Sequence, residues 1–503
     1  MEGFNGLLSI AVFMPILAAA IIAVFLSGKA ARGFAVAATF VELLITSYIF
    51  LIYRNNPDAH GIVDRFSNWI PIESFRVEYF LKVDGLSAPL VLLTGILGIV
   101  AVFASWNITF RIKEHFMWLL VLQGAVIGVF TAMDFFLFFL FWELELIPMF
   151  FLISIWGSGR KEYSAMKFLI FTILGSAFML VGILALYFST GTFDMTILPD
   201  KIAGADLILP ASVLFFLTII GFAIKLPVFP FHTWLPDAHT DAPTAASVML
   251  AGVLLKMGGY GMFRVSAAMF PDQLLDFSWL LALLGVINII YGAAITIRQT
   301  DLKRLIAYSS VSHMGFVLLG LASAKGAAAT LGMTGAALQM FTHGTITALL
   351  FLTVGYIYEK AHTRHIPDLG GLAGKMPFLA TSLLIAGLAS LGLPGTSGFV
   401  AEVMIFLGSF PAWHIFTIIA TVGVVLTAAY ILWMIQRTIF GPRPEHHNNL
   451  PDASLPEMVP VAILVVAIIS VGIYPSVISE TFSTGLDEIM KRITDVTSVK
   501  ALN

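Results

Sequence analysis

The fold is decided by residues 221–261, GFAIKLPVFPFHTWLPDAHTDAPTAASVMLAGVLLKMGGYG. Two apolar runs flank a polar connector in this stretch, and each run carries one lysine, Lys225 or Lys256. Lys225 is followed by Leu226-Pro227, and a proline inside a helix removes a backbone donor and clashes with the preceding turn. We therefore predict that a helix breaks beside Lys225. The buried charge of the lysine and the unpaired backbone groups at the break each destabilise an apolar helix. Their occurrence side by side indicates a functional reason.

The composition places the whole chain in a membrane. Its 503 residues are 59% hydrophobic and 11% charged, whereas a soluble globular protein carries roughly 25% charged residues. The mean hydropathy is +0.94, and apolar runs of about 20 residues, the length that crosses a bilayer, recur throughout. The sequence therefore predicts an all-α polytopic membrane protein.

The same composition excludes several classes of site. Cysteine is absent, so iron–sulfur clusters held by thiolates and thiolate zinc sites are excluded. The sequence lacks a phosphate-binding loop and a dinucleotide-binding glycine fingerprint. We therefore expect no cofactor in this chain, and a net charge of −3 gives no indication of nucleic acid as a partner.

The apolar runs predict about fourteen transmembrane helices. They lie at 7–26, 34–53, 86–106, 116–132, 134–156, 165–188, 210–231, 243–267, 277–297, 302–321, 327–358, 377–408, 413–440 and 457–475. The first run lacks the basic residues and cleavage site of a signal peptide, so we interpret it as a retained span. Alternate loops carry most of the lysines and arginines, and by the positive-inside rule these loops are cytoplasmic and both termini lie outside.

Two segments outside the spans have patterns of their own. Residues 54–84 contain two alternating stretches, which predict a small β-hairpin on the outer surface. Residues 486–496 place apolar side chains at helical spacing, which predicts an amphipathic helix on the membrane surface or on a neighbouring subunit.

A weak internal duplication is visible. Leu226-Pro227 interrupts the seventh span and Leu393-Pro394-Gly395 the twelfth, and an ionisable residue lies near each interruption. Paired broken helices in inverted repeats indicate an ion site in a transporter. We predict two inverted five-helix repeats at 107–268 and 269–440. An N-terminal three-helix segment with the hairpin (1–106) precedes them, and a C-terminal span with the amphipathic helix (441–503) follows.

Several ionisable residues lie at mid-membrane depth, where a charge costs about 2.5–3.5 kcal/mol on insertion scales. They are Glu143, Lys225, Lys256, His313, His343 and Glu402. Glutamate, lysine and histidine can exchange protons near neutral pH when pairs open and close, so the set suits a proton relay. The alternative is that each is a packing residue satisfied by a neighbour.

Further polar residues are secondary candidates. Gln339 stands one helical turn before His343 and predicts a shared polar face. Glu145 is either a second relay member or an interhelical partner. Four connector residues resemble metal ligands, but we interpret them as a proton entrance or an ordinary loop and expect no metal. They are His232, Asp237, His239 and Asp241.

The motifs that carry these residues resemble a known family. FWELELIPMFFLISIWG (141–157), the stretch 225–261, RLIAYSSVSHMGF (304–316) and LPGTSGFVAE (393–402) closely resemble antiporter-like subunit M, or chain 4, of proton-pumping NADH–quinone oxidoreductase, respiratory complex I. The WELELIP form is similar to the photosynthetic version of chain 4. Related proteins include subunits L and N and the large subunits of multi-subunit sodium/proton antiporters.

This resemblance implies a mechanism and a setting. Glu143 and Lys225 would form the coupling pair, Lys256, His313 and His343 would carry the proton onward, and Glu402 would be the outlet residue, whose identity favours subunit M. Quinone, flavin and iron–sulfur clusters would belong to other subunits of the complex. The partners would be L- and N-type subunits and lipid, in a bacterial inner membrane or a thylakoid membrane, with both termini on the periplasmic or lumenal side.

Three functional hypotheses remain open on the sequence. The leading one is a proton-translocating membrane-arm subunit of an NAD(P)H– or ferredoxin–quinone oxidoreductase, a translocase subunit without a redox centre. The second is a subunit of a multi-subunit Na⁺/H⁺ antiporter, against which Glu402 argues mildly. The third is a scaffold, in which Lys225 and Glu402 would affect assembly alone.

Overall fold

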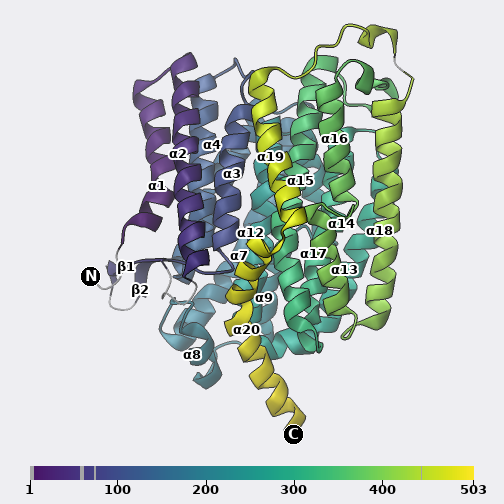
Figure 1. Cartoon of the computed structure of the whole chain (residues 1–503). Coiled ribbons are helices and arrows are strands. Elements are labelled where there is room, and N and C mark those ends of the chain that lie inside the picture. Colours follow the sequence, from purple (N-terminus) through teal and green to yellow (C-terminus); the bar gives the residue numbers. More distant parts are fainter. Residues whose placement is uncertain (1–4, 57–61, 73–74, 443, 503) are drawn as a thin grey trace.

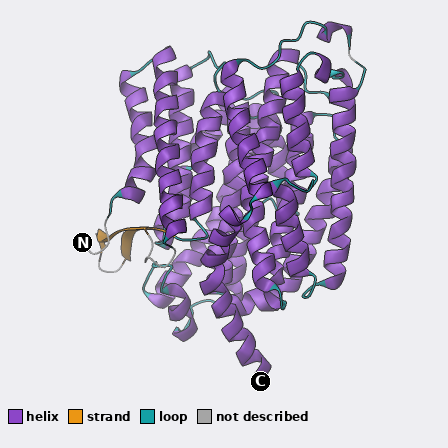
Figure 2. Cartoon of the chain, in the orientation of Figure 1, coloured by secondary structure: helices purple, strands orange, loops and turns teal. Residues whose placement is uncertain are grey.

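A bundle of long helices forms almost the whole molecule (Figures 1 and 2). The structure is a computed structural model that describes residues 5–56, 62–72, 75–442 and 444–502. Within these ranges, eleven helical segments are long and apolar enough to cross a membrane, and four apolar helices are shorter. The predicted all-α polytopic fold is confirmed, whereas the number fourteen stays a prediction.

The long segments follow one another along the chain. They are α1 (Leu7–Phe25), α2 (Gly28–Asn55), α4 (Ile112–Thr131), α5 with α6 (Phe135–Leu144 and Leu146–Trp156), α7 (Lys161–Thr190), the segment Thr244–Ala267 that contains α11 (Thr244–Met249) and α12 (Leu255–Gly261), α13 (Pro271–Ile297), α14 (Leu302–Ala322), α15 (Ala329–Ala361), α18 (His414–Ile435) and α19 (Leu455–Ile473). The shorter apolar helices are α3 (Ala88–Ala104), α9 (Ala211–Lys225), α16 (Pro377–Ser390) and α17 (Ser397–Ser409). Short α8 (Leu198–Gly204) and α10 (Trp234–Asp241) and C-terminal α20 (Ser476–Leu502) complete the helices that are named below.

The seventh span breaks where its prolines predict. Helix α9 ends at Lys225. The side-chain amide of Asn288 on α13 donates to the carbonyl of Pro227 at 3.2 Å and accepts from the amide of Phe229 at 2.8 Å. The indole of Trp234 donates to the carbonyl of Ile224 at 2.9 Å. Polar backbone groups that the break leaves inside an apolar bundle must find such partners, and here tertiary contacts supply them.

The connector after this break is not an open loop. Residues Trp234–Asp241 form the buried helix α10, which packs against α7 and α14. The alternative that this connector is an ordinary loop is therefore wrong, because the chain resumes a helix after the proline-rich turn. The twelfth span has the same design: α16 ends at Ser390, an irregular turn follows, and α17 begins at Ser397.

The predicted β-hairpin is confirmed. Strand β1 (Ile62–Ile72) pairs antiparallel with β2 (Phe75–Val83). Asp64 on β1 accepts hydrogen bonds from the amides of Gly6 at 2.6 Å and Ser9 at 2.8 Å, and so fixes the start of α1 against the hairpin. Helix α20 reaches the same end of the bundle as the hairpin (Figure 1).

The amphipathic C-terminal helix is also present, but its apolar face is turned to this chain's own bundle. Ile478, Phe482 and Leu486 of α20 are buried, and the helix packs against α15, α13 and α3. The sequence could not distinguish this partner from a lipid surface or a neighbouring subunit, because all three cover an apolar stripe equally well.

A glycine pair fixes the closest approach of α20, and this contact is testable. A Cβ on Gly485 would lie 2.1 Å from the amide nitrogen of Leu86 and 2.4 Å from the carbonyl carbon of Gly85. We expect Gly485→Val to push α20 outward and to destabilise its docking by about 1–3 kcal/mol, the usual cost of overpacking. Faster proteolysis of the C-terminal segment, with Ser498→Val on the exposed face as control, would report this. Unchanged protection would contradict the contact.

Candidate functional site: a buried file of ionisable groups

Lys225 lies at the break, and its ion-pair partner is Glu145. The lysine Nζ contacts Glu145 Oε1, and both side chains are almost fully buried, at 1% and 0% exposure. The rings of Trp142 and Phe168 lie 5.7 Å and 5.3 Å from the ammonium. A charge in such an apolar enclosure is retained only with a counter-charge, and Glu145 supplies it.

Glu143 occupies a different position from the one that the resemblance implies. It is half-buried at the end of α5, beside Ser176 of α7, and interacts with Lys225 electrostatically without forming an ion pair. Pro148 has no N–H, so it cannot donate a helical hydrogen bond to the carbonyl of Leu144. The helix is therefore interrupted at Glu145, the residue between α5 and α6. The structure pairs Lys225 with Glu145 and places Glu143 to one side, within electrostatic range of the lysine, so the coupling role of Glu143 stays a prediction.

Lys256 lies at the centre of the second group. Its Nζ contacts the carbonyl of Ala251 and lies 2.7 Å from Nδ1 of His343. The segment Leu250–Leu254 is π-helical, and such a bulge, frequent at functional sites, frees carbonyl groups from the regular ladder. Fully buried Lys256 therefore has a backbone acceptor and a titratable neighbour.

From His343 the file continues to Glu402. The rings of His343 and His313 lie 5.7 Å apart. His313 Nδ1 lies 3.6 Å from Glu402 Oε1, and His313 Nε2 lies 3.2 Å from the hydroxyl of Ser390. A cavity of about 10 Å³ lies between these residues and is also lined by Gln339; it offers space for about one water molecule. The structure thus brings four of the predicted residues into one continuous file.

The helix breaks position the ends of this file. Ser390 is the last residue of α16, and Glu402 stands one turn and a half into α17, so the turn between these helices opens beside His313. Gly392 in that turn has a φ of +78°, and a Cβ there would lie 2.9 Å from Glu402 Oε2. A side chain at position 392 would crowd the carboxylate, so this glycine leaves space for Glu402 beside the turn.

The secondary candidates on α10 and on the short turn before it, Phe231–Thr233, have separate partners. Asp237 accepts from Lys167 Nζ at 2.7 Å, which ties α10 to α7. His232 packs edge-on against Tyr291 at 5.1 Å. His239 is fully buried and stacks on Phe351 at 4.5 Å, and it lies within electrostatic range of Lys256 and Lys303. Each of these three residues thus has its own partners, and among them His239 alone lies within electrostatic range of Lys256.

Sequence reasoning missed several residues that shape the site. Asn288, Ser390 and Lys303 are buried polar residues inside or at the end of predicted spans. A signal was available for Lys303, because it is charged, but its position in the sequence indicated a span end. The structure buries it, and its Nζ donates to the carbonyl of Ala242 at 2.7 Å.

Comparison with known proteins agrees with this geometry. The sequence model described as NADH:quinone oxidoreductase/Mrp antiporter, TM, matches residues 132–427, which include both broken helices and every residue of the file. The chain belongs to this family. Members similar to this antiporter-family chain include NAD(P)H-quinone oxidoreductase chain 4 1 of Microcystis aeruginosa, 40% identical over 97% of this chain and 94% of its own length. Chain 4 1 of Synechococcus elongatus is 41% identical, over 98% of this chain and 92% of its own. The resemblance to chain 4 that the motifs indicate is therefore confirmed.

Solved structures show the same antiporter-family fold. A chain of respiratory complex I from Thermus thermophilus with bound NADH superimposes with a TM-score of 0.86 at 28% identity, and the match covers 97% of this chain and 99% of that one. A chain of a membrane-bound sulfane sulfur reductase, an archaeal respiratory membrane complex, reaches 0.85 at 24% identity over 94% of this chain and 77% of its own; it supports the fold alone. These structural relatives are subunits of multi-subunit membrane complexes.

Proposed function

We propose that this chain is a proton-translocating membrane-arm subunit of an NAD(P)H– or ferredoxin–quinone oxidoreductase. The observation that carries the proposal is the buried file Lys256–His343–His313–Glu402 beside the Lys225–Glu145 ion pair. The chemistry of quinone reduction belongs to other subunits, which would hold the quinone, the flavin and the iron–sulfur clusters. L- and N-type antiporter-like subunits are the proposed neighbours, and both termini are proposed to lie on the periplasmic or lumenal side.

The geometry supports a switch that drives a relay. While Glu145 contacts Lys225, the ammonium is stabilised by its counter-charge. When the pair opens, a buried lysine without a counter-charge releases its proton readily. Lys256 accepts it, His343 and His313 pass it on through their ring nitrogens, and Glu402 releases it. Between Lys225 and Lys256 the helices α9 and α12 pack directly, so this step requires a change in the bundle.

Because Glu402 is the last residue of the file, its replacement is expected to have a large effect on proton transfer. We expect Glu402→Gln to retain assembly and to lower proton transfer through this subunit about tenfold or more, since a positioned acid or base contributes roughly 10²–10⁴-fold. Protons per electron, measured with a pH-sensitive dye in vesicles containing the complex, would report the loss. The control is Glu488→Gln, whose carboxylate is 76% exposed on α20. Full pumping in Glu402→Gln would remove Glu402 from the relay.

The alternative is a subunit of a multi-component Na⁺/H⁺ antiporter, because the matched family includes both classes. Near-full-length similarity to chain 4 of the oxidoreductase favours the first proposal. Purification of the native complex decides between them: copurifying flavin, iron–sulfur clusters and quinone support the oxidoreductase. A complex that lacks all three and exchanges Na⁺ for H⁺ would support the antiporter.

A further inference from the structure

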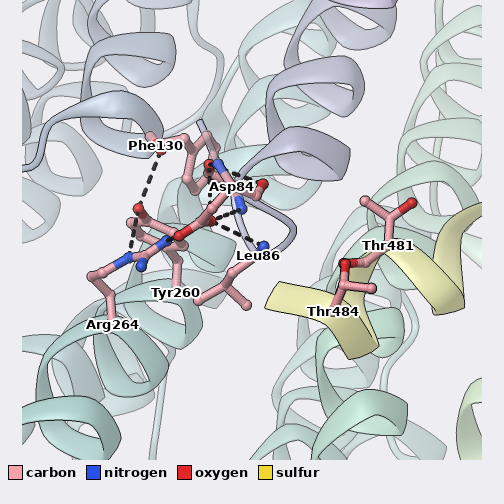
Figure 3. A network of polar contacts seen from close by, with 8 residues as sticks. Asp84, Leu86, Phe130, Tyr260, Arg264, Thr481 and Thr484 are labelled. Carbon is pink, nitrogen blue, oxygen red and sulfur yellow. Dashed lines mark hydrogen bonds and ion pairs between the residues drawn. The ribbon is translucent and has the colours of Figure 1, made fainter. Parts of the chain in front are cut away.

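Below Lys256, the same helix carries two more polar side chains in line. Tyr260 and Arg264 follow Lys256 at intervals of four residues, which places them on one helix face. Arg264 Nε donates to the hydroxyl of Tyr260 at 3.1 Å, so these two side chains do lie along that face. Figure 3 shows both residues beside Asp84. A line of polar groups thus leads from Lys256 toward the hairpin end of the bundle.

This line cannot conduct a proton as it stands. The hydroxyl of Tyr260 donates to the backbone carbonyl of Phe130 at 3.2 Å, and a carbonyl oxygen has no proton to pass on. The ring of Phe130 packs edge-on against Tyr260 at 5.3 Å. The next group, the guanidinium of Arg264, stays protonated at every physiological pH. The polar line is therefore a dead end.

Asp84 holds the guanidinium in place. Arg264 Nη2 lies 2.6 Å from Asp84 Oδ2, and the two side chains are only 13% and 19% exposed. Asp84 Oδ1 also accepts from the amides of Leu86 at 3.0 Å and Ser87 at 3.1 Å. Burial raises the pKa of Asp84, but Arg264, together with Lys82 and the amide of Ser87, holds that pKa below its usual value. The pair is therefore charged at neutral pH.

We propose that Arg264, fixed by Asp84 and Tyr260, is a cationic barrier that closes the direct route from Lys256 to the hairpin face and so directs the proton sideways to His343. The inference rests on the proposed function, because a barrier is needed only beneath a lysine that carries protons. Position 264 lies about 12 Å from position 256 along the axis of a regular α-helix. Fixed arginines exclude protons and other cations from membrane pores by the same electrostatic means.

If Arg264 is a barrier, removing its charge should allow protons to leak across the membrane. We expect the passive proton conductance of vesicles containing the whole complex, measured without electron donor under an imposed potassium diffusion potential, to rise about tenfold in Arg264→Gln. A unit charge at about 12 Å repels a proton by about 1.4 kcal/mol at an effective dielectric constant near 20, which corresponds to about a tenfold change in proton flux. Arg264→Lys keeps the cation and should leak as little as the wild type. Adding Lys256→Gln to Arg264→Gln should abolish the leak, because the route then loses its entrance.

A second variant tests the charge itself. Arg264→His is cationic well below a pH of about 6.5 and neutral well above it, so its leak relative to the wild type should rise as the pH rises. An assembled Arg264→Gln complex with wild-type conductance would overturn the proposal, and so would a leak in Arg264→Lys as large as that in Arg264→Gln. Failure of both the Gln and the His variants to assemble would assign Arg264 to folding alone.

These results also separate the barrier from the relay. If Arg264→Gln does not leak while Lys256→Gln alone reduces pumping, the relay stands and the barrier is wrong. If Lys256→Gln pumps normally and the leak of Arg264→Gln persists in the double variant, the relay through Lys256 is wrong.

Discussion

Replacing Lys225 with methionine should leave the complex assembled and stop proton transfer through this subunit. Methionine keeps the length and apolar packing of the side chain against Trp142 and Phe168. Glu145 can then take up a proton and remain buried as a neutral acid, which avoids the cost of an unpaired charge. We expect coupled turnover to fall about tenfold or more, because a positioned proton carrier contributes roughly 10²–10⁴-fold. Protons per electron and donor-driven turnover in vesicles measure both quantities.

A charge-retaining variant distinguishes proton transfer from structural pairing. Lys225→Arg preserves the cation opposite Glu145, but a guanidinium does not release its proton. A relay role predicts that Lys225→Arg is stable and still inactive, whereas a scaffold role predicts that it works normally. The control is Lys201→Met, which removes an exposed lysine on α8. If Lys225→Met pumps with wild-type stoichiometry and rate, Lys225 has no part in coupling.

Much of this fold could be predicted because single residues determine it locally. A proline pair after Lys225 interrupts a helix in any context, and the alternating residues before Asp84 form a hairpin for the same local reason. The buried file of ionisable residues could also be predicted, because His313, His343 and Glu402 are costly inside a membrane wherever their partners lie. Such features depend on residue type and depth, and both can be read from the sequence.

The pairing of these residues could not be predicted, because it depends on how the helices are rotated. Glu143 and Glu145 are two residues apart, and only one of them can face Lys225. The interruption at Pro148 and the packing of α5 and α6 against α7 decide which. The contact of Lys256 with His343 likewise depends on the π-helical segment before the lysine, and nothing in its composition distinguishes this segment from a regular helix.

Replacing Glu145 with glutamine should therefore have a larger effect than the same change at Glu143. Glu145→Gln leaves Lys225 buried without its direct counter-charge, and breaking a buried ion pair costs about 3–5 kcal/mol. The lysine can avoid that cost by staying neutral, which holds the switch open and stops its cycle. We expect a lower thermal stability of the complex and loss of coupled pumping in Glu145→Gln. Glu143→Gln is the matched comparison, because Glu143 is half-buried and outside the ion pair.

The double variant Glu145→Gln/Lys225→Met sharpens the test. If the two residues act as a pair, adding Lys225→Met should restore most of the stability that Glu145→Gln removes, since the uncompensated charge disappears. The same second change should restore nothing to Glu143→Gln. If instead Glu143→Gln stops pumping while Glu145→Gln pumps normally, the working counter-charge is Glu143, and the contact of Lys225 with Glu145 only holds α9 against the junction of α5 and α6.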